Sequence, residues 1–114
     1  MPYLQIQSNL TIANPQAEEL LQRASTTVAS ELNKPEQYVM VVMAPTVPML
    51  FAGENTPAVF MQLKSIGLSE SQTPGLSKAL CNLAHDTLGV AADRVYIEFV
   101  DAPRKMWGWN GTTF

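Results

Sequence analysis

The second residue of the chain offers the most direct route to chemistry. Aminopeptidases remove an initiating Met1 when the next residue is small, as Pro2 is, and Pro2 would then carry a free secondary amine. A free α-amino group titrates near pH ~8, and apolar burial or a nearby cation lowers that pKa. A neutral amine can take a proton from a carbon next to a carbonyl group, so Pro2 is a candidate general base. The alternative is an idle proline, as in many isolated motif matches.

Two further segments could bind an anionic substrate. Lys34 stands after the first predicted helix, where its ammonium group could bind a carboxylate as a point charge. The alternative is a solvated lysine that the helix dipole favours. The segment Lys64-Ser65-Ile66-Gly67 ends a predicted strand, and its backbone N–H groups could bind a carboxylate or enolate oxygen. The alternative there is an ordinary strand end with a glycine turn.

Aromatic side chains form the third group of candidates. They could line a pocket for an aromatic substrate, and packing in a core or at a subunit interface explains them equally well. Most of them belong to a C-terminal tail that also carries two glycines. The set is Tyr38, Tyr96, Trp107, Trp109 and Phe114.

Other kinds of chemistry have little support in the sequence. His85 is the only histidine, and it does not share a helix face with its neighbour Asp86, so no metal site is expected. Cys81, the only cysteine, falls close to the apolar stripe of the same predicted helix and reads as a small buried residue. No glycine-rich phosphate loop and no G-x-S-x-G elbow occur. We therefore expect neither a metal nor an organic cofactor.

The bulk composition limits the partners. The chain has 114 residues, which suits a single domain over 1–114. Its net charge is −3 with a pI near 4.9 and scattered basic residues, which argues against binding to nucleic acid. No run of ~20 apolar residues predicts a membrane span, and the N-terminus lacks the pattern of a signal peptide. Together with the single cysteine, these features favour a reducing cytoplasm, with release by a non-classical route left open.

Hydrophobic periodicity predicts the elements that must position these residues. The run at 38–44 is apolar on both faces and is interpreted as a central strand covered on both sides. The elements, in order, are a strand at 2–7, a helix with Asn14 as its N-cap that stops near Asn33, the strand at 38–44, a loop at 45–57 with a short turn at 49–52, a strand at 58–66, a helix that starts at Ser69 or at Thr73 and stops at Gly89, a strand at 94–100, and a tail that forms a short strand or hook.

The two halves of the chain align at an offset of 56, as in Leu20 with Leu76 and Val41 with Ile97. Such a repeat predicts a duplicated β-α-β unit, with pseudo-repeats at about 2–45 and 58–101. We therefore expect an α+β fold with a four-stranded mixed sheet, both helices on one face, and a short extra C-terminal strand. The other face would be bare and apolar, which favours an oligomer.

Taken together, the motifs resemble those of the macrophage migration inhibitory factor family, within the tautomerase superfamily. They are spread over the whole chain at compatible spacing. They are Met1-Pro2 before an alternating strand, Lys34-Pro35-x-Gln37-Tyr38, Ser65-Ile66-Gly67, Asp93-Arg94-Val95-Tyr96-Ile97, and Gly108-Trp109-Asn110 followed by Thr112, Thr113 and Phe114.

The resemblance implies a homotrimer with active sites between neighbours, and keto–enol tautomerisation of phenylpyruvate-like or dopachrome-like compounds without a cofactor. Pro2 would act as base and then as acid, while Lys34 and the Ser65-Ile66 segment, through the Ile66 N–H, would hold the carboxylate. Tyr96 would come from a neighbouring subunit. Tyr38, Trp109 and Phe114 would add to the lining.

The sequence departs from the family pattern at several positions. A C-x-x-C motif of many vertebrate members is replaced by Ala58 and Met61, so no thiol-oxidoreductase activity is expected. Glu98 stands where an asparagine commonly binds a substrate phenol, and its charge could shift the substrate preference. Trp107 is bulkier than the usual aliphatic residue, and Lys64 replaces a frequent histidine. These changes keep a second hypothesis open, a cytokine-like factor that binds a protein receptor and has weak or vestigial tautomerase activity.

Overall fold

The computed structural model describes all of residues 1–114, and the order of its elements follows the predicted one. Four short 3-10 helices, at 36–38, 70–72, 92–94 and 104–106, join the main elements. The main elements are strand β1 (Tyr3–Ser8), helix α1 (Asn14–Leu32), strands β2 (Met40–Met43) and β3 (Val59–Ile66), helix α2 (Thr73–Leu88), and strands β4 (Val95–Ala102), β5 (Gly108–Trp109) and β6 (Thr112–Thr113).

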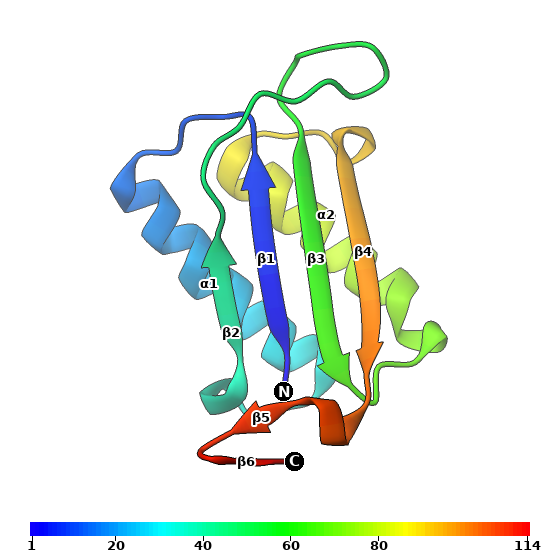
Figure 1. The fold of residues 1–114 in the computed structure, drawn as a ribbon. Helices are drawn as coiled ribbons and strands as arrows, with labels where there is room; N and C mark the ends of the chain where they lie inside the picture. The colour runs from blue at the N-terminus through cyan, green and yellow to red at the C-terminus, as the bar shows by residue number, and fades with distance from the viewer.

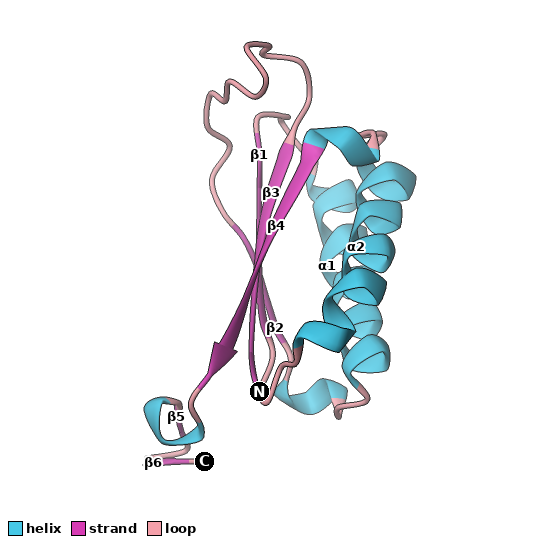
Figure 2. Cartoon of the chain, turned by 90° about the vertical axis from the view of Figure 1, so that its right-hand side faces the viewer, coloured by secondary structure: helices cyan, strands magenta, loops and turns pink.

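The sheet has four strands in the order β2-β1-β3-β4 (Figure 1). β1 and β2 are parallel, β3 and β4 are parallel, and β1 and β3 meet antiparallel at the centre. Each half of the chain thus supplies two parallel strands and the helix between them. Figure 2 shows both helices on one side of the sheet. The predicted α+β fold with a mixed sheet, two helices on one face and an extra C-terminal element is confirmed.

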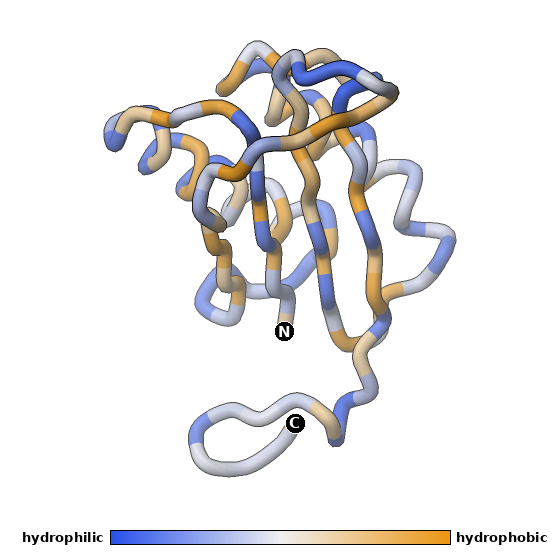
Figure 3. Tube along the Cα trace, turned by 45° about the horizontal axis from the view of Figure 1, so that its top comes forward, coloured by the Kyte–Doolittle hydropathy of each residue, from blue (hydrophilic) through white to orange (hydrophobic).

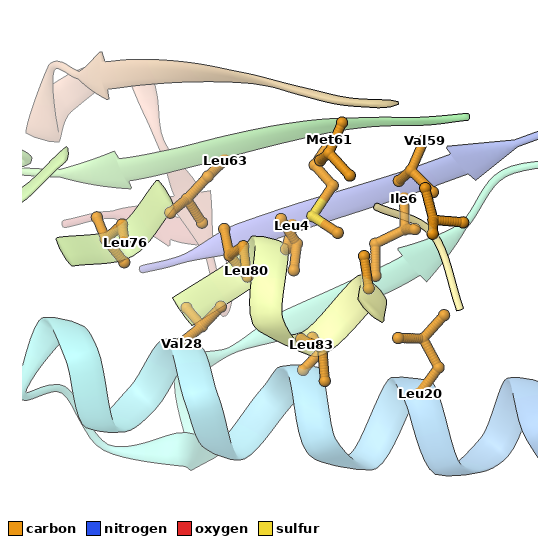
Figure 4. Packing of buried hydrophobic residues seen from close by; sticks show 14 of the residues in the cluster. Leu4, Ile6, Leu20, Val28, Val59, Met61, Leu63, Leu76, Leu80 and Leu83 are labelled. Carbon is orange, nitrogen blue, oxygen red and sulfur yellow. The ribbon is translucent and has the colours of Figure 1, made fainter. Parts of the chain in front are cut away.

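The core lies between the sheet and the helices (Figure 4). β1 alternates strictly, so that Leu4 and Ile6 point toward the helices and are fully buried. The helices contribute apolar residues at three- and four-residue spacing, as the sequence predicts. The buried helix residues of the core are Leu20, Ala24, Val28 and Leu32 from α1, and Leu76, Leu80, Leu83 and Ala84 from α2. No helix has both the length and the apolar character that a membrane span requires.

The ends of the helices mostly follow the predicted signals. Asn33 and Gly89 take the left-handed conformation as C-caps, with φ of 52° and 70°. The two alternatives for the second helix are both present, since Ser69 and Gln72 form a capping box on a 3-10 turn that runs directly into α2 at Thr73. The predicted N-cap role of Asn14 is wrong. Ala13 occupies the cap without a side-chain bond, so the first turn of α1 lacks that contact.

The interpretation of 38–44 as a central strand is also wrong. β2 spans only Met40–Met43 and forms one edge of the sheet, beside β1. Met40 is 60 % exposed. An apolar run records that both faces of a strand avoid water, and it does not tell a central strand from an edge that another protein surface covers. The loop turn also lies two residues later than predicted, at 51–54.

The open face of the sheet is less apolar than predicted. Its middle row is polar, because Gln5, Gln62 and Glu98 stand in register and Gln62 donates to Glu98 over 2.6 Å. The rows on either side mix polar and apolar residues. Tyr3, Lys64 and Val100 stand in register on one side, and Gln7, Phe60 and Tyr96 on the other, where Phe60 and Tyr96 are exposed. Figure 3 shows the alternation of hydrophilic and hydrophobic residues along these strands. The open face therefore carries a fully polar row across its middle, and apolar side chains mixed with Lys64 and Gln7 on either side of it.

The C-terminal tail forms a hairpin of β5 and β6. Its two-residue turn is Asn110-Gly111, and both residues have positive φ, which matches the twist of a tight hairpin. In Figure 1 the hairpin lies at the end of the sheet where the chain begins, opposite the long loop between β2 and β3. The tail thus brings its aromatic residues to the N-terminus.

Candidate active site

The N-terminal segment lies at one end of the sheet, at the start of β1. Pro2 is fully buried, and its carbonyl oxygen accepts a hydrogen bond of 3.0 Å from the Met40 N–H. In the chain as described, the free amine belongs to Met1 and the Pro2 nitrogen is part of a peptide bond. This hydrogen bond ties the start of β1 to the start of β2.

The surroundings lower the pKa of the Met1 amine from 8.0 to about 6. Burial is the largest cause, because it disfavours the charged form. The charge of Lys34 and a hydrogen bond to it follow, and then the charge of Arg104. An amine at this place is therefore mostly neutral at pH 7, which is the state that a general base requires.

Lys34 is positioned by the end of α1. The left-handed Asn33 turns the chain, and the Lys34 N–H caps the helix through the carbonyl oxygen of Ala29 at 3.0 Å. The Lys34 ammonium then donates to the Ser65 hydroxyl at 2.9 Å and to the Ile66 carbonyl oxygen at 2.6 Å. These contacts hold the cation beside the N-terminus.

In the predicted anion-binding segment at the end of β3, the residues Ser65, Ile66 and Gly67 have different roles. Ser65 is 0 % exposed, so its hydroxyl serves Lys34. The Gly67 N–H donates to the Asp101 carboxylate at 3.0 Å, which occupies one of the backbone donors that the sequence suggested for a ligand. Ile66 lines a cavity beside Lys34, and this brings together two of the predicted binding residues.

An aromatic wall stands on the other side of the N-terminus. The Tyr38 ring meets Trp109 edge-on at 5.5 Å between centroids, and Trp109 stacks on Phe114 at 5.6 Å. The hairpin makes this possible, because the Phe114 N–H bonds back to the Trp107 carbonyl oxygen at 3.2 Å. The sequence-predicted residues Tyr38, Trp107, Trp109 and Phe114 are therefore gathered beside Pro2.

Two cavities meet at the N-terminus and share Met1 and Tyr38 as lining residues. The first, of about 230 Å³, is mostly aromatic and apolar, and the second, of about 220 Å³, contains two cations. No carboxylate lines either cavity. The first is lined by Met1, Pro2, Tyr3, Gln37, Tyr38, Val39, Met40, Trp107, Gly108, Trp109 and Phe114, and the second by Met1, Lys34, Pro35, Tyr38, Ile66 and Arg104.

Sequence reasoning missed Arg104 and Gln37 as lining residues of these cavities. Arg104 lies just after β4, in the turn that carries the chain back to the N-terminus. The one available signal was its place between a strand end and the aromatic tail. Because the C-terminal hairpin packs beside the N-terminus, the turn that connects it to β4 lies there too, and Arg104 belongs to that turn.

Tyr96 and Glu98 do not join this site within one chain. Tyr96 pairs in register with Phe60, near the opposite end of β3 from Ile66. Its ring packs on Phe51 at 4.5 Å and borders a third, wholly apolar cavity of about 310 Å³. Glu98 lies in the polar middle row of the open face.

The arrangement supports one type of chemistry. A terminal amine with a lowered pKa stands between a cation that can hold a carboxylate and an aromatic wall that can hold a ring. Such an amine can remove a proton from the carbon between the ring and a carbonyl group. The side chains do not form a cluster that could hold a metal ion.

Comparison with known proteins agrees with this geometry. The sequence model of the family described as "Macrophage migration inhibitory factor (MIF)" matches residues 1–114. The macrophage migration inhibitory factor of Mus musculus is 36 % identical over 115 residues, which covers 100 % of this chain and 99 % of the relative. The crystal structure of the homologue from Prochlorococcus marinus is 42 % identical and superposes with a TM-score of 0.92, covering 98 % of each chain.

A further solved structure bears on the chemistry. It is a protein inactivated by 2-oxo-3-pentynoate, 27 % identical, with a TM-score of 0.86 over 97 % of this chain and 94 % of its own. The fold, the matched residues and the relatives agree over the full length of the sequence, so this chain belongs to the macrophage migration inhibitory factor family.

Proposed function

We propose that the protein is a cofactor-independent keto–enol tautomerase whose acid–base group is the Pro2 amine, exposed when Met1 is removed. The observation that carries the proposal is the lowered pKa of the terminal amine at the junction of an aromatic and a cationic cavity. Burial and the neighbouring cations would act on a Pro2 amine in the same direction. Family membership and the relative that 2-oxo-3-pentynoate inactivates support a 2-oxo acid as ligand.

The proposed substrates are phenylpyruvate-like or dopachrome-like compounds. With phenylpyruvate, the Pro2 nitrogen takes a proton from the benzylic carbon, the C–H electron pair forms the new C=C bond, and the carbonyl oxygen becomes negative. The protonated Pro2 then returns the proton to that oxygen, so that the enol leaves and the amine is restored. Lys34 and the Ile66 N–H hold the carboxylate, and Ser65 positions Lys34.

The aromatic side chains would hold the substrate ring. Tyr38, Trp109 and Phe114 form the wall, and Trp107 lines the first cavity beside them. Tyr96 and Glu98 lie away from Pro2 in their own chain, so they can act only on the site of a neighbouring copy. We therefore propose a homotrimer in which each pocket is completed by the next subunit. Size-exclusion chromatography with light scattering tests it, and a monomer would contradict it.

Turnover of phenylpyruvate tests the proposed activity directly. Wild-type protein with Met1 removed, as verified by intact mass, is compared with Pro2→Gly in the same processed state. We expect Pro2→Gly to lose about 10²- to 10⁴-fold in kcat, the usual contribution of a positioned acid–base group. Equal, robust rates of the two proteins would remove Pro2 from the mechanism.

A cytokine-like binding factor is the alternative function. The observation in its favour is that the bulky Trp107 lines the first cavity, while Glu98 adds charge where the family commonly has an amide. This hypothesis predicts no turnover of several aryl keto acids together with tight binding of a protein receptor. Robust turnover by processed wild type would reject the vestigial site.

A further inference from the structure

Arg104 is the one arginine of the chain without a protein partner. Arg23 forms ion pairs with Glu19 and Asp86. Arg94 donates to four backbone carbonyl oxygens around the 51–57 loop. Arg104 takes part in none of the chain's ion pairs or side-chain hydrogen bonds, and it lines the second cavity beside Lys34.

The other cation of that cavity has most of its donors committed. A lysine ammonium has three N–H donors, and two of those of Lys34 go to Ser65 and Ile66. A carboxylate ligand has two oxygens, each with room for more than one hydrogen bond. Lys34 alone therefore leaves part of a bound carboxylate without donors. The planar guanidinium of Arg104 matches a carboxylate with two parallel N–H bonds.

The electrostatics of the cavity favour the same ligand. No acidic residue lines it, although the chain as a whole has a net charge of −3. The nearby Asp101 is engaged by the Gly67 N–H. Met1 and Arg104 both line this cavity, so the guanidinium and the terminal amine face the same space. A concentrated positive charge in an otherwise acidic protein is a feature of an anion site.

We propose that Arg104 is a substrate-binding residue that pairs with the carboxylate of an aryl 2-oxo acid through both of its terminal nitrogens. Lys34 contacts the same carboxylate, which lies in the second cavity, while the aryl ring lies in the first against Trp109. The reacting carbon then lies between the two, beside the terminal amine. The assignment rests on the proposed tautomerase site, and it adds the residue that selects a carboxylate over an uncharged ligand.

A binding experiment tests this assignment without turnover. The probes are 3-phenylpropionate, which cannot tautomerise, and its uncharged amide, and the readout is the fluorescence of Trp107 and Trp109. We expect Arg104→Gln to weaken binding of 3-phenylpropionate by about ten- to a hundredfold, the range of a charge-assisted hydrogen bond, and to leave binding of the amide unchanged. Arg104→Lys should recover only part of the loss, because a lysine cannot make the bidentate pair.

The matched control is Lys105→Gln. Lys105 lies in the same turn, loses the same charge and lines neither cavity. We expect it to change carboxylate binding less than twofold. Equal weakening by the two variants, loss of amide binding in Arg104→Gln, or no binding of 3-phenylpropionate by wild type would each overturn the assignment.

Kinetics separate this inference from the proposed function. With processed enzyme and phenylpyruvate, Arg104→Gln should raise KM about tenfold or more with kcat within twofold of wild type. A variant that lowers kcat at unchanged KM would contradict a binding role. If wild type shows no turnover at all, the tautomerase proposal fails, and the fluorescence titration still decides whether Arg104 binds the carboxylate.

Discussion

The two ends of the sheet carry cavities of opposite character. At the end where the chain begins, an amine, two cations and a wall of rings meet around Met1. At the other end, the cavity of about 310 Å³ is lined only by apolar and aromatic residues, and Leu50 and Tyr96 on its rim are 74 % and 64 % exposed. Polar groups are costly to desolvate and are kept where they act on a ligand, whereas an exposed apolar patch is typical of a protein contact.

The same contrast extends to the arginines that serve each end. The Arg94 guanidinium lies over the Phe51 ring, 4.9 Å from its centroid, and donates hydrogen bonds to carbonyl oxygens of the loop. These contacts fix the shape of the apolar end. Arg104 leaves its donors free at the cationic end. At one end the arginine is tied to the protein's own loop, and at the other it faces a cavity without a protein partner, which is the arrangement that the proposed binding site requires. The predictions below test that division.

The largest expected effect comes from blocking the terminal amine at the cationic end. Acetylation of the Pro2 amine in processed protein turns it into an amide without a basic lone pair. We expect turnover of phenylpyruvate to fall in proportion to the modified fraction. At complete modification it should be about 10²- to 10⁴-fold below that of the unmodified protein. Intact mass gives that fraction, and a carboxylate ligand added beforehand should protect the amine. Full activity in completely acetylated protein would contradict the division, since the cationic end would then do no acid–base work.

The next effect tests whether the apolar end completes the pocket of a neighbour. Tyr96→Ala should lower kcat/KM roughly ten- to a hundredfold, as expected for loss of a positioning group, although Tyr96 lies far along the sheet from Pro2 in its own chain. Refolding an equal mixture of Tyr96→Ala and Pro2→Gly should then restore activity. In a trimer with shared sites, about a quarter of the sites would combine an intact Pro2 with an intact Tyr96. No recovery above the sum of the separate variants would assign both residues to one chain.

The titration of the amine gives a smaller effect. In protein that retains Met1, the pKa of about 6 means that the folded chain binds fewer protons than the unfolded chain between pH 6 and 8. Stability from this group is thus fully present above pH 8 and is lost as the pH falls toward 6. At pH 7 roughly tenfold more amine is neutral than at a pKa of 8, so acetylation of Met1 should be faster by that factor than in an unfolded peptide.

Lys34→Ala provides the control for that titration. It removes the second and third causes of the shift, the charge of Lys34 and the hydrogen bond to it, and leaves burial and Arg104 in place, so the midpoint of acetylation should move up only part of the way toward 8. A midpoint already near 8 in wild type would show that the cationic end does not tune the amine.

The sequence predicts most of this architecture because the signals are local. Strand alternation, helix periodicity and the caps at Asn33 and Gly89 depend on neighbours within a few residues, and the structure follows them. The N-cap at Asn14 failed because its side chain makes no cap bond, and a propensity cannot reveal that. The prediction that 38–44 forms a central strand failed, because an apolar run does not reveal which surface covers the strand, and β2 lies at the edge of the sheet.

The site divides in the same way. The motifs around Pro2, Lys34 and Trp109 were visible as residue types, and the fold brings them together at one end of the sheet. Arg104 could not be identified from the sequence, because two structural features distinguish it: it lines the second cavity, and it makes no ion pair or side-chain hydrogen bond within the chain. Whether Tyr96 serves a neighbour stays a prediction, because Tyr96 lies near the opposite end of the sheet from Pro2 in its own chain.

The smallest expected effect compares two buried serines, one at each end. Ser65 is 0 % exposed and accepts from Lys34, while Ser8 is 3 % exposed, donates to the Ala58 carbonyl oxygen at 2.8 Å and accepts from the Leu10 N–H at 3.0 Å. Each change to alanine should lower the free energy of unfolding by about 1–3 kcal/mol, because a buried partner loses its hydrogen bond.

Only one of the two serine variants should affect binding. Ser65→Ala frees Lys34 to move and should raise KM for phenylpyruvate a few-fold, whereas Ser8→Ala should leave KM unchanged at a similar loss of stability. Chemical denaturation and steady-state kinetics on the same preparations separate the two quantities. A matched rise of KM in both variants would mean that the pocket responds to general loosening of the sheet, and that the functional division between its ends is weaker than the side chains suggest.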